Sequence, residues 1–214
     1  RAVANYFAYE SVEQAEKADK YSSSRFMSIE GDWRFNFVEN ANERPENFYA
    51  VGYDDSKWDM FPVPGLFEMN GYGDRIYVNV GYVWRNQFDN NPPFVEERNN
   101  YVGSYRQNFT IPADWKGEKV YIHIGSATSN LKVWVNGKYV GYSEDSKMAA
   151  EFDITDYVEF GKPNLIAMQI MRWCDGSYLE DQDFWRFTGI AREAYLYARP
   201  QSRIKDYRVY TNLD

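Results

Sequence analysis

The chain has 214 residues and carries 24 basic against 32 acidic side chains, which gives a formal net charge of −8. This acidity argues against a nucleic-acid-binding protein, which needs a basic surface to neutralise phosphates, and against docking on anionic membrane lipid. No apolar run reaches the roughly 18 residues of a membrane span, and a single Cys and a single His exclude a disulfide framework and a zinc cluster.

The first segment, residues 1–30, is polar and irregular, and we expect it to form an arm that packs on the domain. Within it, Ser11 followed by Gln14 is a capping-box pattern, in which each side chain satisfies a free backbone N–H at the start of a helix. The pattern predicts a short helix that ends near Ala18.

Strand patterning begins at Gly31, where Trp33, Phe35 and Phe37 alternate with polar residues. Residues 39–60 are predicted to form a long loop. The two prolines between Phe61 and Gly65 exclude a central strand there, because proline cannot donate to the backbone ladder. Residues 66–101 also read mostly as loop, and a loop of that length inside a domain is usually functional.

The second half of the chain is rich in strand signals. Alternating or continuously apolar runs predict strands at 104–111, 119–124, 131–135, 138–140, 164–173 and 191–198, with a short strand and turn within 150–158. Asn136-Gly137 joins two of these runs, and this pair predicts a tight hairpin because both residues accept positive φ.

About eight strands, few helices and long loops predict an all-β fold, an antiparallel jelly-roll β-sandwich over residues 31–200. Residues 203–210 alternate like a further strand but have no partner left in the chain. We therefore expect 201–214 to hold the first strand of a following domain.

Two isolated reactive side chains give no catalytic signal. His123 lies in the middle of a predicted strand, where a single histidine is more often structural or simply exposed. Cys174 follows the most apolar strand, and a buried inert thiol is expected because no second His is present to activate it.

The densest polar segment runs from Arg172 to Arg186 and interleaves carboxylates with aromatic rings. Its acidic members are Asp175, Glu180, Asp181 and Asp183, and its aromatic members are Trp173, Tyr178, Phe184 and Trp185. Three interpretations stay open: a site for a hydroxyl-rich ligand, a site for a hard cation with oxygen ligands, and a solvated acidic loop over core aromatics. Loop spacing alone cannot establish a glycosidase acid/base pair.

This segment, continued to Arg192, closely resembles the sugar-binding domain that opens the large β-galactosidases of glycoside hydrolase family 2. Further segments resemble the same domain in the same order, at 31–35, 62–64, 76–80, 91–95 and 134–146. The resemblance implies a galactose-binding-like jelly roll, followed in the family by an immunoglobulin-like domain and a TIM barrel with two catalytic glutamates.

On this resemblance the parent chain hydrolyses terminal β-D-galactosides, and this part completes the galactose pocket without supplying a catalytic residue. We expect the part alone to be inactive and to require no cofactor. An autonomous carbohydrate-binding module and a purely structural sandwich remain as alternatives.

The resemblance also implies roles for individual residues. Asn79, in Tyr-x-Asn-Val, and Asp183, in Glu-Asp-Gln-Asp, correspond to residues that bind galactose, and Asp183 also corresponds to a sodium ligand. Glu144 and Asp175 correspond to magnesium ligands, although the longer N-terminal arm that supplies other ligands is missing here. The family often forms homo-oligomers, and the sequence leaves an exported or periplasmic location and a cytoplasmic one equally open.

Overall fold

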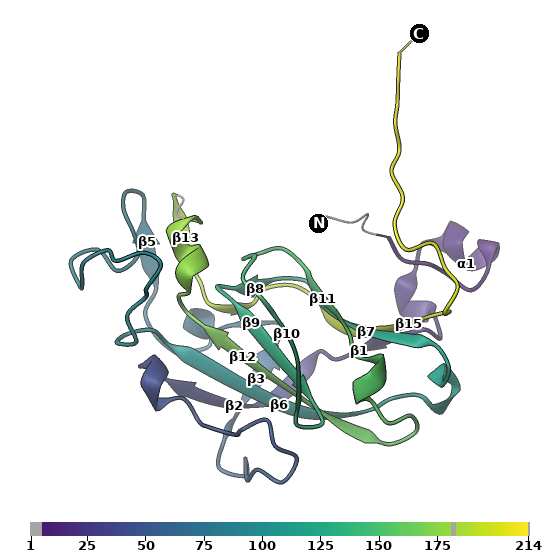
Figure 1. Ribbon diagram of the computed structural model, residues 1–214, viewed down its shortest axis with the longest axis horizontal. Coiled ribbons are helices and arrows are strands. Elements are labelled where there is room, and N and C mark those ends of the chain that lie inside the picture. Colours follow the sequence, from purple (N-terminus) through teal and green to yellow (C-terminus); the bar gives the residue numbers. More distant parts are fainter. Residues whose placement is uncertain (1–5, 181–182, 214) are drawn as a thin grey trace.

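Two antiparallel β-sheets packed face to face make the body of the protein (Figure 1). The computed structural model describes residues 6–180 and 183–213. The smaller main sheet is built, in spatial order, from β1 (Phe26–Ser28), β15 (Ala194–Arg199), β7 (Lys119–Ile124) and β11 (Ala150–Asp153). The larger sheet is built, in spatial order, from β10 (Lys138–Ser143), β9 (Leu131–Val135), β12 (Pro163–Met171), β6 (Val102–Thr110), β2 (Gly31–Val38) and β3 (Asp59–Val63).

Two small sheets lie at the margins of the sandwich. One contains β4 (Gly65–Leu66), β14 (Gly189–Ile190) and β8 (Ala127–Thr128), and the other pairs β5 (Ile76–Val78) with β13 (Phe184–Arg186). The described residues form fifteen strands, so seven more are present than the sequence predicted. Six of the additional strands have only two or three residues, too few to show a period of two.

Helical structure is confined to short segments. The helices are α1 (Val12–Lys17) and the 3₁₀ turns Lys20–Ser22, Ala41–Glu43, Phe67–Met69, Ala113–Trp115, Thr155–Tyr157 and Asp175–Tyr178. The predicted all-β jelly-roll sandwich is thereby confirmed. Within the described residues, no helix has the length and apolar character needed to cross a membrane.

Apolar side chains between the two main sheets form the core. Alternation along β2 buries Trp33 and Phe35, and β7 buries Ile122 and Ile124 from the opposite sheet. Removing this apolar surface from water stabilises the fold by about 25 cal/mol for each Å² buried. The core thus follows from the periodicity that the sequence shows.

The strand β12 is buried on both faces, as its continuous apolar run predicted. Its outer face is covered by the long loop 39–58, whose Phe48 packs with Trp134 and Ala167. Arg106 holds this loop: its guanidinium binds the carboxylate of Asp55 at 2.6 Å and donates to backbone carbonyls of the loop. The loop is therefore a fixed cover of the larger sheet.

Local turn predictions also agree with the structure. Asn136 and Gly137 have φ of 50° and 80° and connect β9 to β10, as the hairpin signal predicted. Pro62 lies in β3, at the edge of the larger sheet, where a missing backbone donor costs least.

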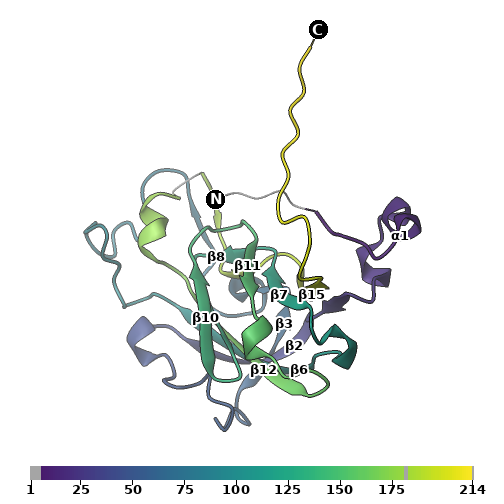
Figure 2. The same cartoon turned by 45° about the vertical axis from the view of Figure 1, so that its right-hand side comes forward.

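Both ends of the described chain lie outside the sandwich. The helix α1 begins after Ser11, whose hydroxyl accepts from the backbone N–H of Gln14 at 3.2 Å, as predicted. Residues 203–213 form no strand and extend away from the domain (Figure 2). That they begin a following domain stays a prediction, and positions 1–5 and 214 lie outside the described residues.

Candidate functional site

A two-stranded ribbon formed by β5 and β13 stands at one end of the sandwich (Figure 1). Its register pairs Val78 with Phe184 and Tyr77 with Trp185. Asn79 directly follows Val78 and Asp183 directly precedes Phe184, so both residues adjoin the last pair of this ladder. The two residues that the resemblance assigned to galactose binding are therefore neighbours in space, although 104 positions separate them (183 − 79).

The ribbon is amphipathic. Directly paired residues of a ladder share a face, so Tyr77 and Trp185 project from one side, and the hydroxyl of Tyr77 contacts the carboxylate of Asp183 on that side. Trp185 and Tyr77 keep 53% and 52% of their surface exposed, and their ring centroids are 5.6 Å apart. This face combines exposed aromatic rings with polar groups.

A hydrogen bond joins the two kinds of group on this face. The hydroxyl of Tyr77 donates to Oδ1 of Asp183 at 2.5 Å. This bond to the carboxylate raises the pKa of Tyr77 above its ordinary value, so the phenol remains a donor at neutral pH. A carboxylate has about four acceptor positions, and the bond to Tyr77 occupies one of them.

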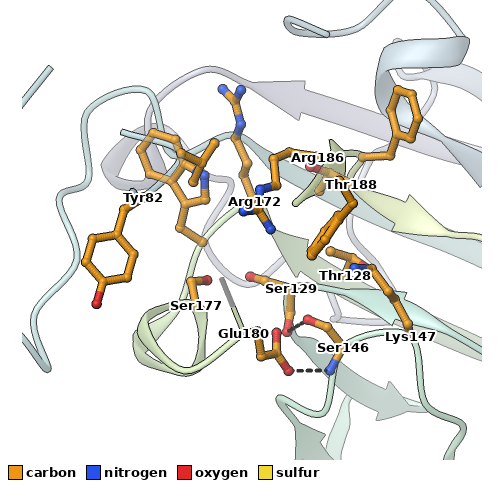
Figure 3. Close-up of a pocket in the computed structure, with 14 residues that line it drawn as sticks. Tyr82, Thr128, Ser129, Ser146, Lys147, Arg172, Ser177, Glu180, Arg186 and Thr188 are labelled. Carbon is orange, nitrogen blue, oxygen red and sulfur yellow. Dashed lines mark hydrogen bonds between the residues drawn. The ribbon is translucent and has the colours of Figure 1, made fainter. Parts of the chain in front are cut away.

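The opposite face of the ribbon lies over a small cavity, in which Figure 3 shows Arg186, Lys147, Ser129 and Glu180 converging. The ring of Phe184 contacts two cations, with Nζ of Lys147 3.1 Å and Cζ of Arg186 3.9 Å from its centroid. The cavity holds about 50 Å³, well below the ~300–1,000 Å³ typical of ligand pockets. It supports the ribbon and is too small for a sugar ring.

A second group of candidate metal ligands contains two carboxylates and one thiol. Glu144, Cys174 and Asp175 each offer a ligand atom, and these atoms lie within 4.8 Å of one another. Burial raises the pKa of the Glu144 carboxyl, and the neighbouring Asp175 raises it further, while a hydrogen bond from Tyr142 opposes the shift. The structure therefore brings together the two residues that the resemblance assigned to magnesium.

The single His and the single Cys lie in environments that indicate a structural role. His123 is buried, stacks on Tyr195 at 4.4 Å between ring centroids, and places Nδ1 3.1 Å from Oε2 of Glu151. Cys174 is buried, and burial raises the pKa of its thiol, which disfavours the reactive thiolate. Asp181, counted in the acidic segment of the sequence, lies outside the described residues.

Tyr77 and Trp185 were not singled out as site residues by the sequence. Trp185 belongs to the segment whose aromatics were noted, but a single short strand does not show which face is exposed. The pairing of β5 with β13 is the missing information, and only the three-dimensional structure supplies it.

Comparison with known proteins places these features in a family. The family described as "Glycosyl hydrolases family 2, sugar binding domain" matches residues 26–200. The chain belongs to this family. The recognition made from sequence motifs is thereby confirmed.

Two relatives and one solved structure define the similarity more closely. The chain is 45% identical over 214 residues to a beta-galactosidase of Priestia megaterium and 40% identical over 213 residues to one of Halalkalibacterium halodurans. Each match covers 100% of this chain and 21% of the relative, so the chain spans about a fifth of their length. The crystal structure of a Bacteroides uniformis beta-glucuronidase matches 82% of this chain and 18% of its own, with a TM-score of 0.62 and 22% identity, which supports the fold.

Proposed function

We propose that this domain forms one wall of the galactose pocket of a β-galactosidase. A catalytic TIM-barrel domain outside this chain supplies the two reacting glutamates, and Asn79 and Asp183 bind hydroxyl groups of the terminal galactose. The single observation that carries the proposal is the end of the ribbon, where Asn79 and Asp183 adjoin the ladder that exposes the rings of Tyr77 and Trp185. The names of the relatives, which are beta-galactosidases, support the substrate.

The chemistry of this face suits a sugar. The amide of Asn79 both donates and accepts, while the carboxylate of Asp183 accepts from hydroxyl groups. The rings of Tyr77 and Trp185 offer apolar faces with a polar edge. A site built from fixed polar partners rejects a sugar with a misplaced hydroxyl, because the mismatch leaves a polar group unpaired.

The cation sites are part of the same proposal. Asp183 is exposed and keeps acceptor positions beyond the bond from Tyr77, so it can serve a sodium ion together with groups from outside this chain. Glu144 and Asp175 are adjacent carboxylates, the oxygen ligands that Mg²⁺ prefers, and a cation between them relieves their mutual repulsion. Cys174, a buried thiol, is a poor magnesium ligand and is left out of the donor set.

The remaining proposals concern the parent protein. Its immunoglobulin-like and TIM-barrel domains are the expected neighbours of this domain in the same chain. A homo-oligomeric assembly is expected from the family.

The test uses the full-length protein with Asn79→Ala and Asp183→Asn. Loss of a hydrogen bond that involves a charged group costs about 1.5–3 kcal/mol, so kcat/KM for a nitrophenyl β-galactoside should fall by roughly 10–150-fold in Asp183→Asn. Asp32→Asn makes the same chemical change on an exposed residue of β2 and is the matched control. Unchanged turnover and an unchanged sodium response in Asp183→Asn would refute the assignment.

A second function, an autonomous carbohydrate-binding module, is favoured by the exposure of Tyr77 and Trp185. Titration of the 214-residue chain with galactose or lactose separates the two. The pocket-wall function predicts little binding because the rest of the pocket is absent, whereas millimolar or tighter binding favours the module.

A further inference from the structure

The segment that carries Asp183 is held on both sides by the loop that joins β10 to β11. Before Asp183 in the sequence, Oε1 of Glu180 accepts from the backbone N–H of Ser146 at 2.9 Å (Figure 3). After it, the ring centroid of Phe184 lies 3.1 Å from Nζ of Lys147. Two consecutive residues of one loop therefore contact the chain on either side of the proposed galactose ligand.

The loop itself is fixed to the body of the sandwich. The backbone N–H of Lys147 donates to the carbonyl of Ala127 in β8 at 3.2 Å, and the carbonyl of Lys147 accepts from Nη1 of Arg192 at 2.9 Å. The hydroxyl of Ser146 donates to the carbonyl of Ser129 at 3.1 Å. Because these three hydrogen bonds hold its backbone, the loop offers fixed points to the segment that it contacts.

Electrostatic attraction strengthens the contacts of Lys147. A cation over an aromatic ring is attracted to the negatively polarised face of that ring, here the ring of Phe184. Partial burial and the guanidinium of Arg186 lower the pKa of the Lys147 ammonium, whereas the carboxylate of Glu180 raises it. Lys147 is thus attracted to a residue on each side of Asp183, the ring of Phe184 and the carboxylate of Glu180.

Asp183 depends on such support from its neighbours. Its side chain is exposed, and the bond from Tyr77 holds the carboxylate but not the backbone. A carboxylate that selects one sugar hydroxyl must be held within about 0.5 Å of its productive position. The position of the Asp183 backbone is therefore set by the residues beside it, and Glu180 and Phe184 are the ones that the loop contacts.

We propose that Lys147 is a positioning residue for substrate binding: it holds Glu180 and Phe184 and thereby orients the carboxylate of Asp183 toward the terminal galactose. The inference rests on the proposed function of Asp183 and deepens it, because it identifies what orients that group. Lys147 lines the small cavity on the face of the ribbon opposite the exposed rings, so it acts through Asp183 and does not contact the substrate.

A double-mutant cycle in the full-length protein tests this role. Lys147→Met removes the charge and keeps an unbranched side chain. We expect KM for a nitrophenyl β-galactoside to rise and kcat/KM to fall by roughly 2–30-fold, the range for the loss of one cation–ring contact. In the Asp183→Asn background the same substitution should cause no further fall, because the carboxylate that Lys147 orients is already absent.

Lys20→Met is the matched control. Nζ of Lys20 lies 4.7 Å from the ring centroid of Tyr195 and 2.5 Å from Oε1 of Glu193, so this lysine also contacts one ring and one carboxylate. It belongs to the N-terminal arm, which lies at the other end of the molecule from β5 and β13 (Figure 1). Lys20→Met should leave kcat/KM within about twofold of wild type. Lys147→Arg keeps the positive charge and should retain most of the activity that Lys147→Met loses.

Either of two results would overturn the inference. One is an unchanged kcat/KM in Lys147→Met, and the other is an equal fall in the wild-type and Asp183→Asn backgrounds, which would show that Lys147 does not act through Asp183. If thermal unfolding shows that Lys147→Met is misfolded, Glu180→Gln takes its place in the cycle. That variant removes the charge that attracts Lys147 and keeps a carbonyl oxygen for the N–H of Ser146.

The two proposals fail in different ways. If Asp183→Asn leaves turnover of the galactoside unchanged, the galactose site is wrong, whatever Lys147→Met does. If Asp183→Asn lowers kcat/KM while Lys147→Met does not, only the positioning role of Lys147 is wrong.

Discussion

Tyr77 and Asp183 are joined across two strands that lie more than one hundred positions apart in sequence, by a hydrogen bond of 2.5 Å from the phenol to Oδ1. The acceptor is diagonal to the donor, since Tyr77 pairs directly with Trp185 in the ladder. The bond holds the carboxylate of Asp183 on the face of the ribbon that carries Tyr77 and Trp185. It is the contact through which the ribbon orients its polar group.

Tyr77→Phe should weaken substrate binding without unfolding the domain. The phenol is half exposed, so its removal should raise KM for a nitrophenyl β-galactoside by a few fold, in line with about 0.5–1.5 kcal/mol for an ordinary hydrogen bond. Steady-state kinetics of the full-length protein measures the effect. A KM equal to that of the wild type would contradict a role for Tyr77 in orienting the carboxylate of Asp183.

Glu151→Gln should lower stability at neutral pH and have less effect in acid. Burial alone would raise the pKa of Glu151, but hydrogen bonds with His123 and Tyr197 hold it below its ordinary value of 4.5. A carboxylate with a lowered pKa in the folded state stabilises the protein above the unfolded pKa, and this contribution is lost as pH falls through the folded pKa.

The expected loss at about pH 7 is under about 1 kcal/mol, because the side chain is 41% exposed and solvent screens the interaction. Urea unfolding of the wild type and the variant at about pH 7 and about pH 3.5 measures it. A difference that persists undiminished in acid would contradict the proposed origin.

Gly189→Ala should destabilise the domain by more than about 2 kcal/mol. Gly189 has φ of 122°, and a Cβ there would lie 2.5 Å from the carbonyl oxygen of Gly65 in the paired strand. Gly52→Ala is the control, because nothing lies within 4 Å of its Cβ position, and it should stay within about 0.5 kcal/mol of wild type. Similar urea midpoints for the two variants would show that the β4–β14 pair can move apart at little cost.

Asp175→Asn should abolish stabilisation by magnesium. If Glu144 and Asp175 hold the ion, Mg²⁺ at about 100 times its Kd stabilises the wild type by about 2.7 kcal/mol through mass action. Thermal unfolding with and without Mg²⁺ measures this difference. Cys174→Ser keeps both carboxylates and should retain the response, whereas an equal response in Asp175→Asn would remove that residue from the site.

Local signals predicted much of the fold. Asn136-Gly137 produced a hairpin because its conformational preference acts within four residues, and Pro62 was correctly excluded from a central strand for the same local reason. The continuous apolar run of β12 was correctly interpreted as a strand buried on both faces. What covers that strand, the loop anchored by Arg106, could not be predicted, because its contacts join distant positions.

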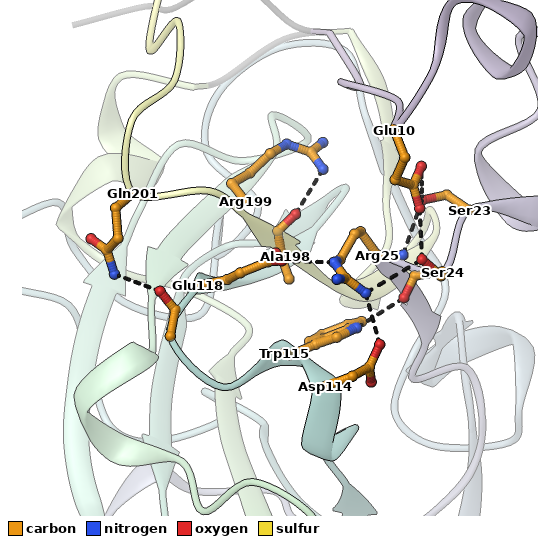
Figure 4. A network of polar contacts seen from close by, with 11 residues as sticks. Glu10, Ser23, Ser24, Arg25, Asp114, Trp115, Glu118, Ala198, Arg199 and Gln201 are labelled. Atoms are coloured by element: carbon orange, nitrogen blue, oxygen red, sulfur yellow. Dashed lines mark hydrogen bonds and ion pairs between the residues drawn. The ribbon is translucent and has the colours of Figure 1, made fainter.

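The docking of the N-terminal arm was expected, but its chemistry was not. Figure 4 shows the guanidinium of Arg25 between Glu118 and Asp114, at 2.9 and 2.8 Å. Beside it, the indole N–H of Trp115 donates to the carbonyl of Ser24 at 2.9 Å. These contacts join residues about ninety positions apart in the sequence, so no local periodicity could predict them.

In the candidate site, too, the sequence predicted individual residues but not the contacts between distant positions. Motif resemblance proposed Asn79 and Asp183 one by one, while their proximity depends on three-residue strands too short to carry a period. The aromatic neighbours on their face followed only from the ladder between β5 and β13.

Because side chains alternate along the ladder of β5 and β13, the alignment of the two strands decides which side chains are exposed. A slip of β13 by a single residue against β5 would turn Trp185 toward the sandwich and expose Phe184 and Arg186 in its place. The contacts of the Phe184 ring with Lys147 and Arg186 oppose such a slip. Two cations on the buried side of the ribbon thus stabilise the alignment that exposes Tyr77 and Trp185, so a substitution of either cation can change the exposed face without lying on it.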